Sequence, residues 1–438
     1  MRRHGLVRCR LAVAVVIGLA LALGGGAWTP AAIGASAWSL PTHPVTVTYW
    51  DSAEAVKNDL VSKILIPEYE KLHPNVTIKY EIVSDLQSKL LVALSTGTAS
   101  DMFSVPDWFL PKYLQTHVLD ALPPAAWGQS NVTGVMSAYL PHMLDAMLDQ
   151  GKLYGVPAQE NAHSLYMNNR LLRDAGLDPM KDAPKTWDDV ARLNKVLTKS
   201  QNGQVVQKGW EMRYINDDGH WQAQMFQILL YQAGGEVTRN GRPVFNSAAG
   251  VKALETWKGV TVAPQITQNT SGSPYQDFAT EHDAMTFAGP NAGASIEKIN
   301  PQMAGNYSVA PLPQIRPDHP ATIIYSFDWG VNAKAPEDER AVAWDFIHYM
   351  GTRPAQWMAA ARYLQPVKGW YDAPEAKQVP FLSVFVHDLS IGKPLARTAN
   401  YPELQSSLVR MIERVILNGG DPKQALDQAA EEYVRAAK

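Results

Sequence analysis

The sequence is almost without cysteine, because Cys9 is the only thiol in 438 residues. One cysteine cannot form a disulfide within the chain. Cys9 also lies in an amino-terminal segment that we expect to be removed, so the mature protein would contain no thiol. This excludes cysteine catalysis. It also excludes a lipid anchor on a cysteine at the cleavage site, because Cys9 precedes the one long apolar run.

Long apolar runs are equally scarce, and the one uninterrupted run covers residues 11–23. Its length of about 13 residues is short of the ~20 that a membrane-spanning helix needs. Arginines precede the run, and the small-residue sequence Ala35-Ser36-Ala37 follows it. This order is typical of a signal peptide. We therefore predict a signal peptide at residues 1–37 and an exported, extracytoplasmic mature chain, in the periplasm or at the outer face of the cell membrane.

Basic clusters are absent as well, and the formal net charge is -3 at pH 7. The first 37 residues contain four arginines and no lysine, aspartate or glutamate, so removing them lowers the net charge to about -7. A nucleic acid needs a basic surface, so we expect no nucleic-acid partner. A strongly anionic ligand is disfavoured for the same reason, although a local pocket can override the global charge.

The sequence also lacks the short motifs of common enzymes. It contains no G-x-S-x-G elbow, no H-E-x-x-H pair and no phosphate-binding loop. Its 11 histidines show no spacing that suits a zinc ion. We therefore predict no metal site, no cofactor and no enzymatic activity.

What the sequence does contain is an alternation of strand and helix patterns. Apolar residues alternate at 45–49 and 76–82, which indicates strands, and recur every fourth residue at 56–64 and 86–94, which indicates helices. A third short strand is expected at residues 102–105. This order predicts an α/β fold with an open, mostly parallel sheet. Ligands of such sheets bind beyond the carboxyl ends of the strands.

The ends of several helices can be predicted from single residues. Gly97 is a natural stop for the helix that begins near residue 86. Thr186 can cap a helix, and Asp421-Pro422 can begin the last one. About 400 mature residues exceed what one core usually serves, and no flexible linker interrupts them. We therefore expect two lobes between which the chain crosses several times.

Seven segments resemble, in order, the extracellular solute-binding proteins of carbohydrate importers, the maltose-binding-protein-like family. Each segment alone is a weak signal, but their order and spacing along nearly the whole mature chain are specific. The segments are VTVTYWDS (45–52), LSTGTASDMFSV (94–105), YGVPAQENAHSLYMNNRLLRDAGLD (154–178), PKTWDDV (184–190), DAMTFAGPNAG (283–293), VAPLP (309–313) and WGVNAKAPEDERAVAWDFIHYM (329–350).

The resemblance implies a two-lobed periplasmic-binding-protein fold, in which each lobe is a mostly parallel sheet flanked by helices and a hinge joins the lobes. The first lobe would comprise residues 42–156 and 312–367, and the second residues 157–311 and 368–438. It also implies a monomer that captures a sugar or oligosaccharide between its lobes. The carbohydrate would then be delivered to a membrane-embedded ABC importer permease.

Two residues depart from the family pattern. Ser100 stands where the family often has a proline before the third strand. Asn291 follows the glycine-rich turn where the family often has a tryptophan. The second departure removes one expected stacking ring and leaves the size of the ligand open.

The chemistry of sugars gives a criterion for candidate ligand residues. Sugar hydroxyls pair with carboxylates, amides and guanidinium groups, and aromatic rings stack on the C–H faces. Residues of these kinds lie at the expected strand ends, after the first crossover, on the glycine-rich turn and near the return crossover. The candidates are Trp50, Asp51, Asp107, Trp108, Glu160, Asn161, Trp221, Asn291, Asp328, Trp329, Arg362 and Tyr363.

Several of these candidates have a structural interpretation as well. Trp108 fits surface packing as well as ligand binding, Trp221 fits core packing better, and Arg362 could be a surface charge. We favour Asp328 and Trp329 as a hydroxyl acceptor and a stacking ring.

Two other functions remain open. The same fold could bind glycerol phosphate, a polyamine, iron or another small solute. A secreted glycoside-cleaving enzyme would need two carboxylates at a fixed separation, which Asp51, Glu160 and Asp328 could supply. The candidate residues are mainly aromatic, neutral or acidic, which favours a neutral sugar.

Overall fold

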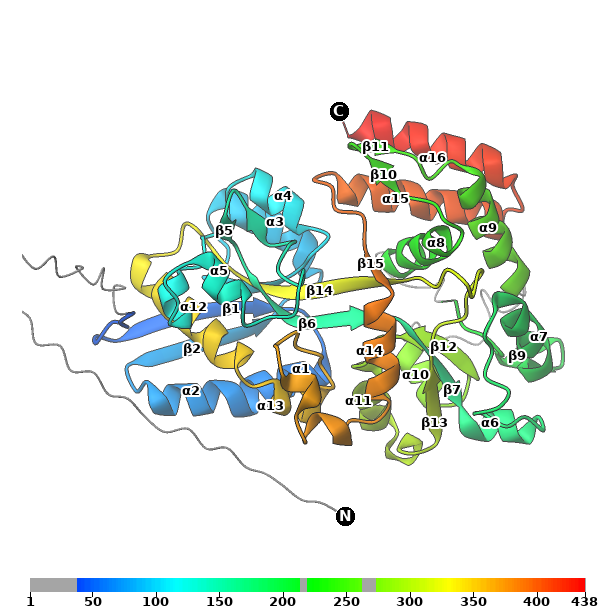
Figure 1. Ribbon diagram of the computed structural model, residues 1–438, viewed down its shortest axis with the longest axis horizontal. Helices are drawn as coiled ribbons and strands as arrows, with labels where there is room; N and C mark the ends of the chain where they lie inside the picture. Colours follow the sequence, from blue (N-terminus) through cyan, green and yellow to red (C-terminus); the bar gives the residue numbers. More distant parts are fainter. Residues whose placement is uncertain (1–37, 213–218, 262–272, 438) are drawn as a thin grey trace, which may run out of the picture. The chain divides into compact units, whose positions relative to one another are not determined.

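The computed structural model describes residues 38–212, 219–261 and 273–437. The predicted signal peptide, Cys9 and most of the loop before Trp221 lie outside these residues. Within them, helices and strands alternate along the chain, and this confirms the α/β class (Figure 1).

The first sheet contains the three strands that the sequence predicts and adds three that come from distant parts of the chain. Its order is β15-β14-β3-β1-β2, and β6 pairs with β14. The pairs of β1 with β2 and with β3 are parallel, whereas β14 is antiparallel to β3 and β6. The strands are β1 (Val45–Asp51), β2 (Val76–Ile82), β3 (Met102–Pro106), β6 (Val156–Ala162), β14 (Thr322–Val331) and β15 (Gly392–Pro394).

Helices cover this sheet because their apolar stripes face it. In α3, Leu86, Leu90 and Leu94 are buried, and Gly97 ends the helix with φ 76°, as predicted. The helical elements of this part of the chain are α1 (Ala55–Leu60), η1 (Val61–Leu65), α2 (Ile66–Leu72), α3 (Leu86–Thr96), α4 (Leu110–Gln115), η2 (Pro124–Trp127), α5 (Val132–Met136), α12 (Glu337–Gly351) and α13 (Pro354–Ala361).

The second sheet has three strands in the order β12-β7-β13. These strands are β7 (Ser164–Asn168), β12 (Met285–Ala288) and β13 (Tyr307–Ala310). Both neighbours of β7 run antiparallel to it, which differs from the mostly parallel sheet that we expected there. Strands β12 and β13 share one direction, and β7 runs between them in the opposite direction. Three short hairpins lie outside the sheets, namely β4 (Leu148–Asp149) with β5 (Lys152–Leu153), β8 (Lys199–Gln201) with β9 (Gln204–Gln207), and β10 (Thr238–Arg239) with β11 (Arg242–Pro243).

Helices surround the second sheet, and two of them begin at the predicted caps. Thr186 and Asp189 form a reciprocal capping box at α7, and the Asp421 side chain caps α16. The helical elements are α6 (Asn169–Asp174), α7 (Trp187–Leu197), α8 (His220–Gln232), α9 (Ala248–Val260), α10 (Pro274–Ala279), α11 (Ala292–Ile299), η4 (Pro301–Met303), η5 (Trp370–Asp372), η6 (Ala376–Gln378), α14 (Leu382–Ser390), α15 (Tyr401–Ile412), η7 (Glu413–Leu417) and α16 (Pro422–Ala436).

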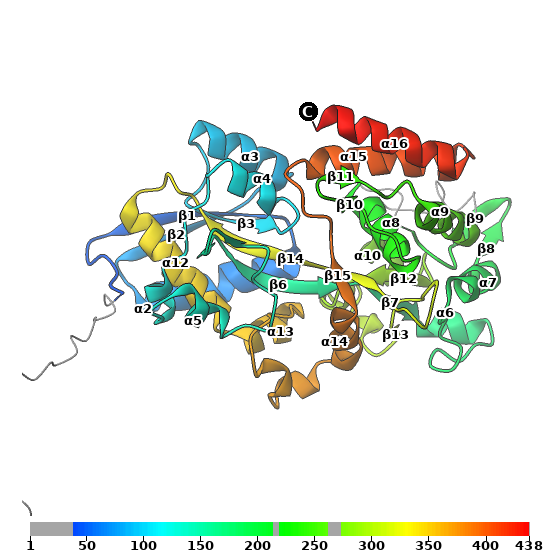
Figure 2. The ribbon, with the colours of Figure 1, turned by 45° about the horizontal axis from the view of Figure 1, so that its top comes forward.

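Strands β6 and β14 connect the two sheets and lie side by side in both ribbon views (Figures 1 and 2). Every residue of β6 is buried, and most of β14 is buried as well. One core cluster contains β1–β3, α12 and α13, and the two other core clusters lie around the second sheet. The chain thus crosses repeatedly between two groups of elements. The lobe boundaries at residues 156, 312 and 367 stay a prediction.

No helix among the described residues is long and apolar enough to span a bilayer.

Candidate functional site

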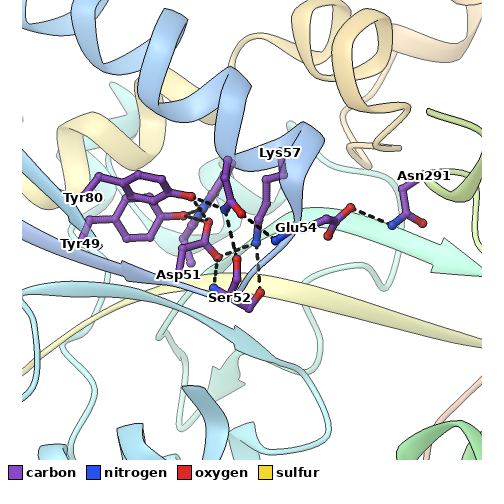
Figure 3. Close-up of polar contacts among 9 residues, drawn as sticks. Tyr49, Asp51, Ser52, Glu54, Lys57, Tyr80 and Asn291 are labelled. Atoms are coloured by element: carbon purple, nitrogen blue, oxygen red, sulfur yellow. Dashed lines mark hydrogen bonds and ion pairs between the residues drawn. The ribbon is translucent and has the colours of Figure 1, made fainter. Parts of the chain in front are cut away.

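The carboxyl end of β1 carries Asp51, which is fully buried and fully paired (Figure 3). Its carboxylate accepts hydrogen bonds from Lys57 Nζ at 2.5 Å, Tyr49 Oη at 3.0 Å and Tyr80 Oη at 2.9 Å. The backbone N–H of Ser52 donates a fourth bond at 2.8 Å. A carboxylate with this many donors has little capacity left for a ligand. We therefore assign Asp51 the role of fixing the loop after β1.

Trp50 points away from this network. Its indole N–H donates to Glu81 Oε2 at 3.1 Å in an exposed position along β2. The structure does not bring Trp50 together with the other candidates, since alternate residues of a strand face opposite sides.

The loop after β1 reaches the glycine-rich turn through Glu54. Asn291 Nδ2 donates to Glu54 Oε1 at 2.9 Å, and Figure 3 shows these two side chains pointing toward each other. Asn161 borders the same turn, because a methyl group on Gly289 would lie 3.0 Å from the Oδ1 atoms of both Asn161 and Asn291. Tyr166 Oη holds the turn by donating to Gly289 O at 2.8 Å. A side chain at position 289 would require both amides to shift, because they approach the glycine backbone closely.

Three further candidates come together where β3 ends beside β6 and β14, and we call them the carboxylate cluster: Asp107 after β3, Glu160 on β6 and Asp328 on β14. Glu160 pairs with Ser326 across β6 and β14, and the Asp107 N–H donates to Ser326 O at 3.0 Å. Asp328 lies two residues further along β14. The exposed fractions of the cluster residues are 1% for Asp107, 5% for Glu160 and 0% for Asp328.

Burial controls the electrostatics of this cluster. Desolvation raises the pKa of Glu160 and of Asp328 well above the usual range, and the charge of Asp107 adds to both shifts. Desolvation also raises the pKa of Asp107, although its ion pair with Arg397 at 2.8 Å opposes the shift. These groups therefore take up a proton more readily than carboxylates in water.

Five further residues pack ring against ring, and we call them the aromatic cluster: Trp108, His163, Trp221, Tyr325 and Phe327. Trp108 lies 5.6 Å from both Tyr325 and Phe327, and His163 lies 5.2 Å from Trp221, measured between ring centroids. Trp221 and Phe327 are half-buried, whereas the other three are buried. Tyr325 and Phe327 alternate with Ser326 and Asp328 along β14, so these two rings face the side of the strand opposite to Asp328.

Trp329 and Tyr363 lie in the core of the first sheet. The Trp329 indole N–H donates to Tyr49 Oη at 3.0 Å, and its ring lies 5.6 Å from Trp357. Tyr363 stacks on the same Trp357 ring, at a centroid distance of 5.6 Å and an interplanar angle of 4°. Both residues are 1% exposed. We assign Trp329 and Tyr363 to packing. Asp328 and Trp329 face opposite sides of β14, so Trp329 faces away from the carboxylate cluster.

Arg362 links two helices. It ends α13 in the left-handed region with φ 55°, and its guanidinium pairs with Glu297 of α11 at 2.7 Å and donates to Tyr307 Oη. It borders a groove of about 490 Å³ between α1, α11 and α13. Arg362 therefore connects elements of the two core regions, which sequence reasoning did not foresee.

Sequence reasoning missed Arg397, Glu54 and Tyr325. Buried acids need a cation, but nothing in the sequence places Arg397 beside Asp107, which is 290 positions away. Tyr325 lies on β14 within a mostly apolar run, where its pattern is that of a core residue.

No group of His, Cys, Asp or Glu side chains among residues 38–212, 219–261 and 273–437 has an arrangement that could hold a metal ion.

Comparison with known proteins gives one family match. The model of the family described as bacterial extracellular solute-binding protein matches residues 54–357. A lactose-binding protein of Rhizobium radiobacter is 25% identical over 320 residues, which span 69% of each chain. An arabinooligosaccharide-binding protein of Halalkalibacterium halodurans is 22% identical over 52% of this chain and 49% of its own length.

Solved structures share the fold at low sequence identity. A maltose-bound MalE3 of T. maritima aligns with a TM-score of 0.76 at 19% identity, covering 89% of this chain and 99% of that one. A solute-binding protein of Thermotoga lettingae with bound α-D-tagatose aligns with a TM-score of 0.74 at 21% identity, covering 90% and 100%. These matches confirm the two-lobed α/β fold.

Proposed function

The chain belongs to the bacterial extracellular solute-binding proteins, and from this membership we propose that it captures a sugar or oligosaccharide between its two lobes. The relatives named above bind lactose and arabinooligosaccharides, and the structural neighbours hold maltose and tagatose. These names are consistent with a carbohydrate ligand for this chain. The captured sugar would pass to a membrane-embedded ABC importer permease.

The observation that carries the proposal is that β6, β14 and the segments next to them hold both buried polar groups and aromatic rings. The carboxylate cluster supplies acceptors, the amides Asn161 and Asn291 supply donors and acceptors, and the aromatic cluster supplies stacking faces. Sugars require this combination, because their hydroxyls need hydrogen-bonding partners and their C–H faces need apolar contact. We propose Asp107, Glu160, Asn161, Trp221, Asn291 and Asp328 as the ligand-contacting residues.

In this proposal, ligand binding shifts the population of the protein from an open to a closed arrangement of the two lobes. A ligand that contacts both lobes stabilises the closed arrangement, because the open one offers only half of the contacts. We propose residues 42–156 with 312–367 as the first lobe and 157–311 with 368–438 as the second. In this proposal the protein is an exported monomer that leaves its ligand chemically unchanged.

A thermal-shift screen of the chain from Trp38 onward tests this proposal. The panel contains mono- and oligosaccharides together with glycerol phosphate and polyamines. We expect one sugar family to raise the melting temperature, with a shift that grows as the ligand concentration exceeds its Kd. Chromatography of the recovered sugar should show it intact. Cleaved sugar would support the hydrolase alternative instead, and a shift with glycerol phosphate or polyamine alone would overturn the carbohydrate assignment.

A further inference from the structure

The carboxylate cluster carries more negative charge than its protein neighbours neutralise. Within the described part of the chain, one ion pair reaches these three acids, namely that of Arg397 with Asp107. If all three acids were ionised, the cluster and Arg397 together would have a net charge of about -2, which is unfavourable in a buried environment. Either protons or a cationic partner must compensate for this charge.

Three oxygen atoms of the cluster are buried acceptors without a donor. Oδ1 of Asp107 and both Oδ1 and Oδ2 of Asp328 have no hydrogen-bond partner at ordinary geometry. The Ser326 hydroxyl lies close enough to lower the pKa of Asp328, but it does not satisfy either oxygen. Buried polar atoms in native proteins are nearly always paired. These oxygens are therefore suited to a donor that comes from a ligand.

We propose that the carboxylate cluster binds a basic amino group, so that the preferred ligand is an amino sugar or an oligosaccharide that contains one. This inference rests on the proposed carbohydrate function. An ammonium group has three N–H donors and no acceptor, so it can donate to the unpartnered oxygens and it offsets one of the two excess negative charges. A neutral hydroxyl brings one donor and leaves the excess negative charge in place.

Calorimetry with matched ligands tests the inference. Each series compares an amine with its N-acetylated and its hydroxyl counterpart, using glucosamine, galactosamine, mannosamine and the chitosan disaccharide as the amines. At pH 7 we expect the amine of at least one series to bind about tenfold or more tightly than both neutral counterparts. If neutral members bind as tightly in every series, the inference is wrong and the carbohydrate function stands. If no carbohydrate binds at all, both proposals are wrong.

Two variants separate ligand recognition from folding. Glu160→Gln and Asp328→Asn keep the shape of the side chain and remove its charge, so the preference for the amine should fall about tenfold. Affinity for the neutral counterpart should fall less than affinity for the amine, because a neutral ligand loses a hydrogen-bond acceptor and no ion pair. Asp145→Asn is the matched control, because the Asp145 side chain is 47% exposed and pairs with His142 on the surface. A purely structural role would weaken amine and neutral ligands alike and would overturn the proposal.

The binding reaction should also move protons. With a neutral ligand the buried acids keep the protons that their environment favours, whereas a bound ammonium group favours the ionised carboxylates. Titrations in two buffers of different ionisation enthalpy should show proton release with the amine and none with its neutral counterpart. Equal proton exchange for both ligands would contradict the assignment of the amine to this cluster.

Discussion

At the scale of the single residue, the protein buries carboxylates in two different ways. Asp51 receives donors from Lys57, Tyr49, Tyr80 and the Ser52 N–H, so its charge is compensated within the chain. Asp328 is equally buried, but its oxygens have no such set of donors. A fully paired acid holds a loop in place, whereas an unpaired acid costs stability and is retained where a ligand completes it.

Replacing Asp51 by alanine should therefore destabilise the protein strongly. The change leaves the Lys57 ammonium group buried without its 2.5 Å partner, and we expect the free energy of unfolding to fall by about 3–5 kcal/mol. Urea denaturation measures the loss. Asp145→Ala removes an exposed partner of His142 and should have little effect. A loss for Asp51→Ala no larger than that of the control would show that the network does not stabilise the fold.

At the scale of the element, the predictability of each strand from sequence depends on whether one of its faces is exposed. In β1, Val45, Val47 and Tyr49 are buried, and the residues between them are more exposed, so the alternation shows which side faces the core. In β14 nearly every residue is buried, so the sequence gives no sign of which side chains share a face. The sequence therefore favours Asp328 and Trp329 together as ligand residues, whereas the structure places them on opposite faces of the strand.

Helix α14 offers a test at this scale, because its buried Asp388 is tied to the start of β7. Asp388 Oδ2 accepts from Ser164 Oγ at 2.5 Å, and Asp388 is 0% exposed. Burial raises the pKa of Asp388 from 3.8 to about 7. The folded chain then binds this proton more tightly than the unfolded chain does. The resulting stability is fully present below pH about 4, falls as the pH rises, and is lost above pH about 7.

Asp388→Asn should remove this pH dependence while keeping the side-chain shape. The difference in the free energy of unfolding between variant and native chain should shift by about 4 kcal/mol from pH 4 to pH 8, in favour of the variant at high pH. Urea titrations across this range measure the shift. A difference that stays constant with pH would show that Asp388 does not titrate between folded and unfolded states.

At the scale of the whole chain, the sequence predicts the class of fold better than it predicts the site. The order of strands and helices and the caps Thr186 and Asp421 come from local patterns, which the structure confirms. The site depends on contacts between distant segments, as in the pairing of Asp107 with Arg397. Such contacts follow from tertiary packing, and local patterns carry no information about them.

The contacts of α11 with α1 and α13 give the last prediction, which concerns the chain as a whole. Lys298 pairs with Asp59 at 2.6 Å, Glu297 pairs with Arg362 at 2.7 Å, and Asn291 donates to Glu54. These polar contacts join α11 and the residue before it to α1, to the end of α13 and to the loop before α1, all of which pack beside the first sheet. They exist only when the two regions are close, so they should favour the closed arrangement.

A double variant, Glu297→Gln with Lys298→Met, should weaken binding of any ligand by about threefold to tenfold, because closure loses two ion pairs while the ligand contacts remain. Small-angle scattering should show a more expanded chain in the ligand-free state, and added salt should have a smaller effect on affinity than in the native chain. Glu236→Gln is the control, since Glu236 pairs with Arg239 three residues away. If scattering and affinity match those of the control, these contacts form equally in the open and closed arrangements and closure depends on the ligand alone.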